Sequence, residues 1–444
     1  MPPIEPGRGL RTSVAAGALA LVLVAPVRGQ DPQVFVVQSE LYTNVTVIDG
    51  RGGAPRPESA ILVWGGEIQA IGSPEQMTIP EGTTIVDLDG AWVVPGFIDA
   101  QASPRAPEEF ERMLASGITG VRERGMAPDV YEASAGEPPG GGPHPTWFVE
   151  GPALGAGSDP RGLGLASEEE GIEAIERQTG DGAGFVTLAP SIPTEWLVGL
   201  ARAARRNDAR VWSDRQGAGW VRSLRAGVDV ASRLLSGDPA LLAESERGAY
   251  EADSSGRIGR LAAWLSRLDP EGPEVDRAVG ALLSRDASVI PLLAAAQAPL
   301  ACVPGATGCR PADAAEADAL RSAWPVAQAL LRGLHEQGVR LLVGSDAPDG
   351  YDPGTGFHRE MELLVEAGIP EVEVLGMATR NGAIALGRLH ERGTLEIGKR
   401  ADFVVLEGNP LQDIRNARRI GFVVLEGRAW RQGAEGGLER VRFR

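Results

Sequence analysis

The chain has 444 residues, of which 43% are hydrophobic and 23% charged, enough apolar material for a large buried core, so a wholly disordered chain is excluded. Its 59 glycines and 33 prolines are scattered without a period, which excludes a collagen-like fibre. With 43 Lys and Arg against 60 Asp and Glu, the formal net charge is −17. Because no basic patch stands out in the sequence, nucleic acid is not expected as a partner.

The N-terminus carries an uncharged apolar stretch at 14–25, preceded by Arg8 and Arg11. This stretch is too short for a membrane-spanning helix, which needs about 20 residues, but it has the size of the apolar core of a secretory signal peptide. The residues at 27–29 then provide a cleavage region. We therefore predict a signal peptide over 1–29 and a secreted or periplasmic protein with no membrane segment after cleavage.

Two regions read as β-structure: residues 34–94, and a second region of the same character at 393–432. Both alternate short apolar stretches with Gly-containing turns, which predicts antiparallel strands. Since neither region alone has enough strands to bury its apolar face, we expect one small composite β-sandwich domain, built from both ends of the mature chain.

Between these regions, residues 95–390 alternate strand-like with helix-like segments. The eight strand candidates occupy residues 94–100, 118–123, 146–151, 184–189, 209–214, 228–232, 288–293 and 339–346. Eight strands with intervening helices predict an α/β protein with a (β/α)₈ TIM barrel. The stretch 234–286 is longer than one crossover requires, so we expect additional helices there.

Two cysteines, Cys302 and Cys309, are separated by the turn-rich segment VPGATG. In an oxidising compartment this spacing favours a local structural disulfide. A metal-binding pair is the alternative, but no His or further Cys lies near by in the sequence to complete four ligands.

Three segments resemble the amidohydrolase superfamily, in particular its imidazolonepropionase- and Xaa-Pro dipeptidase-like branch. They are AWVVPGFIDA at 91–100, GVRLLVGSDAP at 338–348, and the long stretch 363–414 that ends in ADFVVLEGNPLQDI. The resemblance implies a metal site at the carboxyl ends of the barrel strands, where Zn²⁺ or other divalent ions activate water to hydrolyse C–N bonds. A metal is used for this chemistry because it lowers the pKa of bound water to about 7.

The positions at which the resemblance implies metal ligands hold other residues in this chain. The His-x-His after the first barrel strand corresponds to Gln101 and Ser103, and the lysine of the fourth strand corresponds to Thr187. Lys399 is the only lysine of the chain and lies in the C-terminal sandwich region, so no other lysine can substitute.

The remaining ligand positions follow the fifth, sixth and last strands. The histidine of the fifth strand corresponds to Asp214, with an offset of one residue possible, and that of the sixth strand corresponds to Arg233. Only the aspartate of the last strand persists, as Asp346, which is therefore the one candidate catalytic residue.

The four histidines of the chain do not restore the site. His335 lies in a predicted helix, His390 in a loop that leaves the barrel, and His144 before the third strand. His358 follows the last strand and matches a residue common in this branch. It could contact a ligand, but packing or capping at the following helix is the favoured interpretation.

Arg122, Glu123 and Arg124 close the second strand. The family often carries an Arg–acid pair there, and we interpret the three as an internal salt-bridge cluster that supports the barrel rim.

A zinc site takes about three protein ligands, typically including imidazoles, whereas Arg233 is a permanent cation. We therefore predict no cofactor and a degenerate amidohydrolase-family protein that acts as a binding or partner subunit. Its expected partner is a small molecule or a homologous amidohydrolase subunit. The alternative is an active hydrolase of non-peptide or dipeptide C–N bonds, with an unorthodox site around Asp346, Asp214 and Arg233.

A lone carboxylate in a partly desolvated barrel mouth is costly. We therefore predict that the Arg233 guanidinium lies within salt-bridge distance of Asp346, of Asp214, or of both.

Overall fold

The computed structural model describes residues 39–443 except 126, 135–137, 139–141, 150, 161, 214–218, 302–310, 348–351 and 434–435. The predicted signal peptide over 1–29 and the predicted Cys302–Cys309 disulfide lie outside these residues. Among the helices that the structure describes, none is long and apolar enough to cross a membrane.

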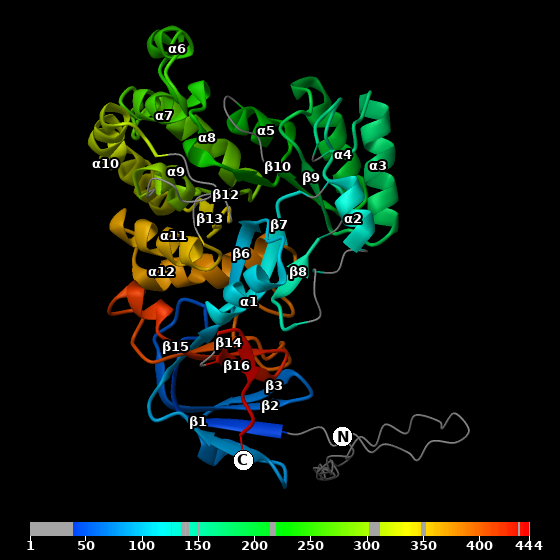
Figure 1. The fold of residues 1–444 in the computed structure, drawn as a ribbon, viewed down its shortest axis with the longest axis vertical. Helices are drawn as coiled ribbons and strands as arrows, with labels where there is room; N and C mark the ends of the chain where they lie inside the picture. The colour runs from blue at the N-terminus through cyan, green and yellow to red at the C-terminus, as the bar shows by residue number, and fades with distance from the viewer. Residues whose placement is uncertain are drawn as a thin grey trace, which may run out of the picture. The chain divides into compact units, whose positions relative to one another are not determined.

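Both ends of the described chain meet in one nine-stranded mixed sheet. Its N-terminal strands are β1 (Ser39–Val47), β2 (Arg56–Trp64), β3 (Glu67–Gly72), β4 (Thr84–Asp87) and β5 (Trp92–Pro95), and its C-terminal strands are β14 (Phe403–Leu406), β15 (Ile420–Leu425), β16 (Arg428–Gln432) and β17 (Leu438–Arg440). The two groups join where β5 pairs antiparallel with β14, and Tyr42 of β1 packs edge-on against Phe403 of β14 at 5.2 Å. Strands from the two ends of the colour scale therefore lie side by side in Figure 1, which confirms the predicted composite domain.

The central part of the chain forms the predicted TIM barrel. Its eight parallel strands are β6 (Phe97–Ala102), β7 (Ile118–Glu123), β8 (Thr146–Phe148), β9 (Phe185–Leu188), β10 (Arg210–Ser213), β11 (Val230–Ser232), β12 (Ser288–Ile290) and β13 (Arg340–Leu341). The strands form a three-stranded sheet (β6–β8) and a five-stranded sheet (β9–β13). The two sheets meet at one seam where the Ala100 amide donates to the Val343 carbonyl at 2.9 Å and the Asp346 amide donates to the Gln101 carbonyl at 2.8 Å. At the other seam Leu154, which follows β8, bridges to Leu188 of β9. Each strand overlaps one of the eight ranges that the sequence predicts.

Helices cover the barrel. They are α1 (Pro107–Ala115), α2 (Pro128–Ser134), α3 (Glu168–Gly180), α4 (Leu197–Arg206), α5 (Trp220–Ala226), α6 (Glu244–Glu251), α7 (Arg257–Leu265), α8 (Pro273–Leu283), α9 (Leu293–Ala301), α10 (Ala314–Glu336), α11 (Thr355–Glu366), α12 (Glu371–Gly376) and α13 (Gly382–Ala385). The chain also has the 3-10 helices η1 (Pro74–Gln76), which lies between β3 and β4, η2 (Thr194–Trp196), η3 (Leu234–Ser236), η4 (Pro239–Leu241) and η6 (Ile414–Arg418), and the π-helix η5 (Met377–Asn381). Helices α6, α7 and α8 fill the stretch 234–286, where the sequence predicts additional helices.

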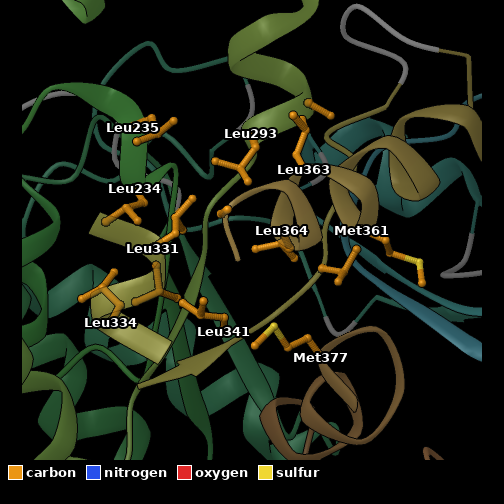
Figure 2. Packing of buried hydrophobic residues seen from close by; sticks show 14 of the residues in the cluster. Leu234, Leu235, Leu293, Leu331, Leu334, Leu341, Met361, Leu363, Leu364 and Met377 are labelled. Atoms are coloured by element: carbon orange, nitrogen blue, oxygen red, sulfur yellow. The ribbon is translucent and has the colours of Figure 1, made fainter. Parts of the chain in front are cut away.

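The main hydrophobic core lies between the barrel strands and these helices. Figure 2 shows Leu331 of α10, Leu341 of β13 and Leu364 of α11 converging in it, and each of the three is at most 1% exposed. The α10 and α11 side chains come from the helices that precede and follow β13 in the chain. The core therefore fixes the last barrel strand, beyond which Asp346 lies.

Gly96 connects the sandwich strand β5 to the first barrel strand β6. A Cβ atom at this position would lie 2.1 Å from Thr119 Oγ1 and 2.8 Å from Thr119 Cβ. We predict that Gly96→Ala lowers the free energy of unfolding by about 2 kcal/mol, the usual range for an overpacked buried site. The urea midpoint measures this loss. Gly280→Ala, in α8 where a Cβ meets nothing within 4 Å, should instead stabilise the protein by up to about 1 kcal/mol, and equal effects of the two changes would contradict this account.

Candidate functional site

The carboxyl ends of four barrel strands bring a charged cluster together. Gln101 belongs to β6, Arg124 directly follows β7, Arg233 directly follows β11, and Asp346 lies beyond β13. All four belong to segments that end at the same face of the barrel, the face that carries active sites in TIM-barrel enzymes. We call these residues the Asp346 cluster.

Asp346 is the centre of this cluster and is 1% exposed. Its Oδ2 lies 2.6 Å from Arg233 Nη2, which confirms the predicted Arg233–Asp346 salt bridge. Its Oδ1 lies 2.7 Å from Arg124 Nη1 and accepts a 3.3 Å hydrogen bond from Gln101 Nε2. Both carboxylate oxygens thus face guanidinium groups, an arrangement of short, charge-assisted hydrogen bonds.

Arg124 is predicted to belong to a salt-bridge cluster at the barrel rim, but its partner Asp346 is not predicted from the sequence. Of the three side chains after Val121, Arg124 reaches Asp346, Glu123 accepts a 2.6 Å hydrogen bond from Ser103 Oγ, and Arg122 donates to Thr187. The charges of Arg124 and Arg122 also act on Glu123 and favour its ionised form. The strict alternation of side chains along a strand places Arg122 and Arg124 on one face. That alternation is the signal by which Arg124 could have been assigned to the barrel mouth.

Thr187 stands at the position that corresponds to the family's lysine, and its side chain contacts Arg122. The Arg122 Nη2 donates to Thr187 Oγ1 at 2.6 Å, and Arg122 is 1% exposed. Its guanidinium lies 4.3 Å from the Trp212 ring and 5.5 Å from the Phe185 ring. These two cation–π contacts partly compensate the Arg122 guanidinium for the hydration that it loses on burial.

Two buried carboxyl groups surround the cluster. Asp99 Oδ2 accepts a 2.6 Å hydrogen bond from Ser345 Oγ, and Asp99 Oδ1 accepts from the Ser345 and Gln101 amides at 3.0 and 3.1 Å. Burial raises the pKa of Asp99 to about 7. Burial likewise raises the pKa of Glu123 to about 7. In both groups burial therefore favours the protonated form, and for Glu123 the neighbouring Arg124 and Arg122 oppose this effect.

The backbone is strained at three successive strand ends. Arg233 has a φ of 61°, Leu292 a φ of 57° and Asp346 a φ of 56°. These are left-handed conformations, which cost a non-glycine residue about 1–2 kcal/mol each. Such strain is concentrated at functional sites, and here it occurs at the residues that form the Arg233–Asp346 pair.

His358 does not join the Asp346 cluster. Its Nε2 lies 2.9 Å from the Ser116 carbonyl oxygen, and its ring packs edge-on against Phe97 at 5.7 Å. Because Phe97 begins β6, His358 lies at the amino end of the barrel, opposite the cluster. Burial lowers the pKa of His358 to about 4, so the residue is neutral and packs in the core, as the favoured interpretation expects. Asp214 lies outside the described residues.

Comparisons with known proteins agree with this fold. Residues 317–429 match the Amidohydrolase family model. The chain is 28% identical to the imidazolonepropionase of Symbiobacterium thermophilum, over 79% of this chain and 84% of that protein. It is 26% identical to the imidazolonepropionase of Deinococcus radiodurans, over 80% of this chain and 87% of the relative.

Solved structures of similar fold include a protein of Bifidobacterium longum assigned as a prolidase, with a TM-score of 0.67 and 24% identity over 91% of this chain and 97% of that one. A Xaa-Pro dipeptidase with bound methionine in its active site has a TM-score of 0.65 and 18% identity, covering 89% of this chain and all 100% of its own. The chain is therefore similar to proteins of the amidohydrolase superfamily. Over most of its length it is similar to imidazolonepropionases, and its fold matches that of a Xaa-Pro dipeptidase.

One further buried acid, Glu360, is expected to make the stability of the protein depend on pH. Glu360 of α11 is 0% exposed, its Oε2 accepts a 2.7 Å hydrogen bond from the Ala294 amide, and burial raises its pKa to about 8. An unfolded glutamate has a pKa of about 4.3, so the folded state binds the proton more tightly. The stabilisation from this protonated group is complete at low pH and is lost as the pH rises from about 4 to 8.

We predict that Glu360→Gln, which keeps the group neutral, reduces the loss of unfolding free energy between pH 5 and pH 9 by about 2 kcal/mol. Urea unfolding across this pH range measures the loss. Glu336→Gln, at an exposed position at the end of α10, serves as the control and should leave the profile unchanged. If both variants retain the wild-type profile, the assignment of Glu360 as a protonated core acid is wrong.

Proposed function

We propose that this amidohydrolase-superfamily protein is exported and binds a small molecule or a partner without metal-dependent hydrolysis. The observation that carries the proposal is the pairing of Asp346 with the two guanidinium groups of Arg124 and Arg233, at 2.7 and 2.6 Å. The resemblance to the family implies that an aspartate at this position would be a metal ligand. Two permanent cations at hydrogen-bond distance from it compete with a divalent ion for the same oxygens.

The other described residues at the implied ligand positions do not fit a divalent metal. Gln101, Ser103, Thr187 and Arg233 stand where the resemblance implies imidazole or lysine ligands, and none of the four supplies an imidazole, a carboxylate or a thiolate, which are the ligands of zinc. Within the ranges that the structure describes, no group of three or more His, Cys, Asp and Glu side chains is arranged as a metal site. On this proposal the salt bridges of the Asp346 cluster hold the strand ends together in place of a metal ion.

Elemental analysis and activity assays of the purified, processed protein test the proposal together. We expect no stoichiometric metal after dialysis, and no hydrolysis of imidazolonepropionate, N-acyl amino acids or Xaa-Pro dipeptides with or without added Zn²⁺. Turnover that disappears in the Asp346→Asn variant would instead favour the alternative, an active C–N hydrolase with an unorthodox site around Asp346, Asp214 and Arg233.

Export is tested separately by expressing the full chain in a bacterial host and sequencing the N-terminus of the recovered protein. We expect a periplasmic or secreted product that begins at about residue 30, as a cleaved signal peptide requires. An intact N-terminus in the cytoplasmic fraction would contradict export but would leave the proposal about the Asp346 cluster unaffected.

A further inference from the structure

A pocket of about 470 Å³ lies between α5, α6 and α8, the helices drawn in green in Figure 1. None of the described residues that line it belongs to the Asp346 cluster. Its lining includes four arginines from the three helices: Arg222 and Arg225 of α5, Arg247 of α6, and Arg277 of α8. We propose that this pocket binds a linear polyphosphate group, either free or carried by a nucleotide. The inference goes beyond the proposed function and does not depend on it.

The two arginines of α5 supply unused hydrogen-bond donors. Arg222 and Arg225 are three residues apart, and side chains at this spacing are neighbours on a helix surface. Both residues are exposed, and neither side chain makes a hydrogen bond or an ion pair with any residue of the described ranges. A guanidinium carries five N–H donors in a planar fork that matches a phosphate group. This wall of the pocket can therefore hold two neighbouring phosphate groups.

The arginines of the other two helices are held in position by the protein. The Arg247 Nε donates to the Leu242 carbonyl at 3.0 Å. This bond fixes the side chain through Nε and uses neither of its two Nη groups. Arg277 Nη2 lies 2.6 Å from Glu274 Oε1. Side chains that are already ordered lose less conformational entropy when a ligand binds, so these two arginines are partly preorganised for a ligand in the pocket.

The charge of the lining favours an anion with more than one charge. Four arginines against Glu244 and Glu274 give the described lining a formal charge of +2, although the whole chain has a formal charge of −17. Four guanidinium groups around one pocket repel one another, and a bound polyanion would convert this repulsion into attraction. A singly charged ligand would neutralise only half of the excess charge.

The position of the arginines on three helices favours a linear chain of phosphate groups over a single phosphate. One phosphate group has room for one or two guanidinium partners, whereas every group of a di- or triphosphate carries its own charge and its own acceptor oxygens. Arginine–phosphate hydrogen bonds are charge-assisted and frequently paired. Among the described residues of the lining there is no aromatic ring on which a nucleobase could stack. The phosphate chain is therefore the part of the ligand that the pocket recognises.

The floor of the pocket is fixed from below by a buried acid. Asp238 is 1% exposed and accepts hydrogen bonds from the Val221 amide at 3.0 Å and the Ala240 amide at 2.9 Å. Val221 and Ala240 both line the pocket, so this carboxyl group ties the first turn of α5 to η4. Burial raises the pKa of Asp238, and the charges of Arg222 and Arg225 oppose that effect. The pocket is thus formed before any ligand arrives.

Titration calorimetry of the purified protein with inorganic triphosphate, in a buffer without divalent cations, tests the inference. We expect triphosphate to bind at least about tenfold more tightly than orthophosphate, because it meets more of the arginines with charge-assisted hydrogen bonds. The double variant Arg222→Gln with Arg225→Gln should weaken triphosphate binding by at least about tenfold. Its urea midpoint should stay unchanged, since both side chains are exposed.

A second double variant, Arg202→Gln with Arg206→Gln, is the matched control. It removes two exposed arginines of the neighbouring helix α4 that do not line the pocket, so it changes the net charge by the same amount. We expect it to bind triphosphate as the wild type does. Absent binding of triphosphate, equal affinities for triphosphate and orthophosphate, or equal effects of the two double variants would each overturn the inference.

Titration with ATP distinguishes the two sources of the polyphosphate group. Affinities for ATP and triphosphate that agree within about threefold would support a pocket that accepts a nucleotide through its phosphates. ATP binding that is at least about tenfold weaker would support free polyphosphate as the ligand, because the nucleoside would then obstruct the pocket. Metal content and hydrolysis at the Asp346 cluster are measured separately, so either proposal can fail without the other.

Discussion

Replacing Arg233 by methionine should lower the free energy of unfolding by about 3 kcal/mol, at the lower end of the range for breaking one side of a buried ion pair. Arg233 Nη2 lies 2.6 Å from Asp346 Oδ2, and the Asp346 side chain is 2% exposed. The methionine keeps much of the apolar stem but leaves this carboxylate oxygen without its closest counter-charge. Arg124 still faces the other oxygen at 2.7 Å, which limits the loss.

Arg277→Met is a matched control for this change. Arg277 and Glu274 form an ion pair of the same length, 2.6 Å, but the Arg277 side chain is 59% exposed. Solvent screening should reduce the cost of this second variant to less than about 1 kcal/mol. Urea midpoints at constant m-value measure both losses. Equal losses would show that burial of the Arg233–Asp346 pair has no energetic consequence, and the account of the Asp346 cluster would then be wrong.

A zinc site should appear when histidines are placed at three positions together, Gln101→His, Ser103→His and Arg233→His. The three imidazoles with Asp346 supply four ligands of the kinds that zinc accepts. The change at 233 matters most, because it removes a cation from Asp346 and adds a ligand at the same time. Histidine also tolerates the left-handed backbone found at residue 233 better than most residues do.

The variant with histidines at 101 and 103 alone is the control, and it should bind no stoichiometric zinc because Arg233 still occupies Asp346 Oδ2. Elemental analysis after dialysis measures the bound metal, and a zinc-dependent rise of the unfolding midpoint gives a second readout. Adding Arg124→Gln to the triple variant should strengthen binding further, since it frees the second carboxylate oxygen. Zinc bound equally well by the double and triple variants would refute the view that Arg233 excludes the metal.

The contrast between Arg124 and Arg233 shows how far the sequence predicts the cluster. The Arg233–Asp346 pair is predictable because both residues follow parallel strands of one barrel, and the carboxyl ends of such strands meet at one face. Arg124 also follows a barrel strand, but Arg122 and Glu123 stand directly before it. The sequence does not indicate which of these three charged side chains reaches Asp346. Only the tilt of β7 and the position of Asp346 across the barrel decide which of the three side chains reaches that carboxylate.

His358 and Tyr250 are two further residues whose positions in the fold the sequence does not predict. His358 follows the last strand in the sequence, yet α11 carries it back to the amino end of the barrel, where it meets the Ser116 carbonyl. Tyr250 of α6 carries no motif, yet it lines a pocket of about 190 Å³ together with Arg233 beyond β11 and Leu292 beyond β12. Neither placement can be predicted from local pattern, since each depends on how a helix packs against elements distant in the sequence.

The sequence by itself determined the eight barrel strands, the composite sheet from both ends of the described chain, and the residue types at the strand ends. These follow from short-range rules: side-chain alternation, turn residues and the need of each apolar face for a cover. The tertiary structure alone decided that two guanidinium groups share Asp346, that Arg122 lies among aromatic rings, and that arginines of three helices line one pocket. Those features are contacts between residues far apart in the chain, and their geometry is set by strand tilt and helix packing, which no local pattern encodes.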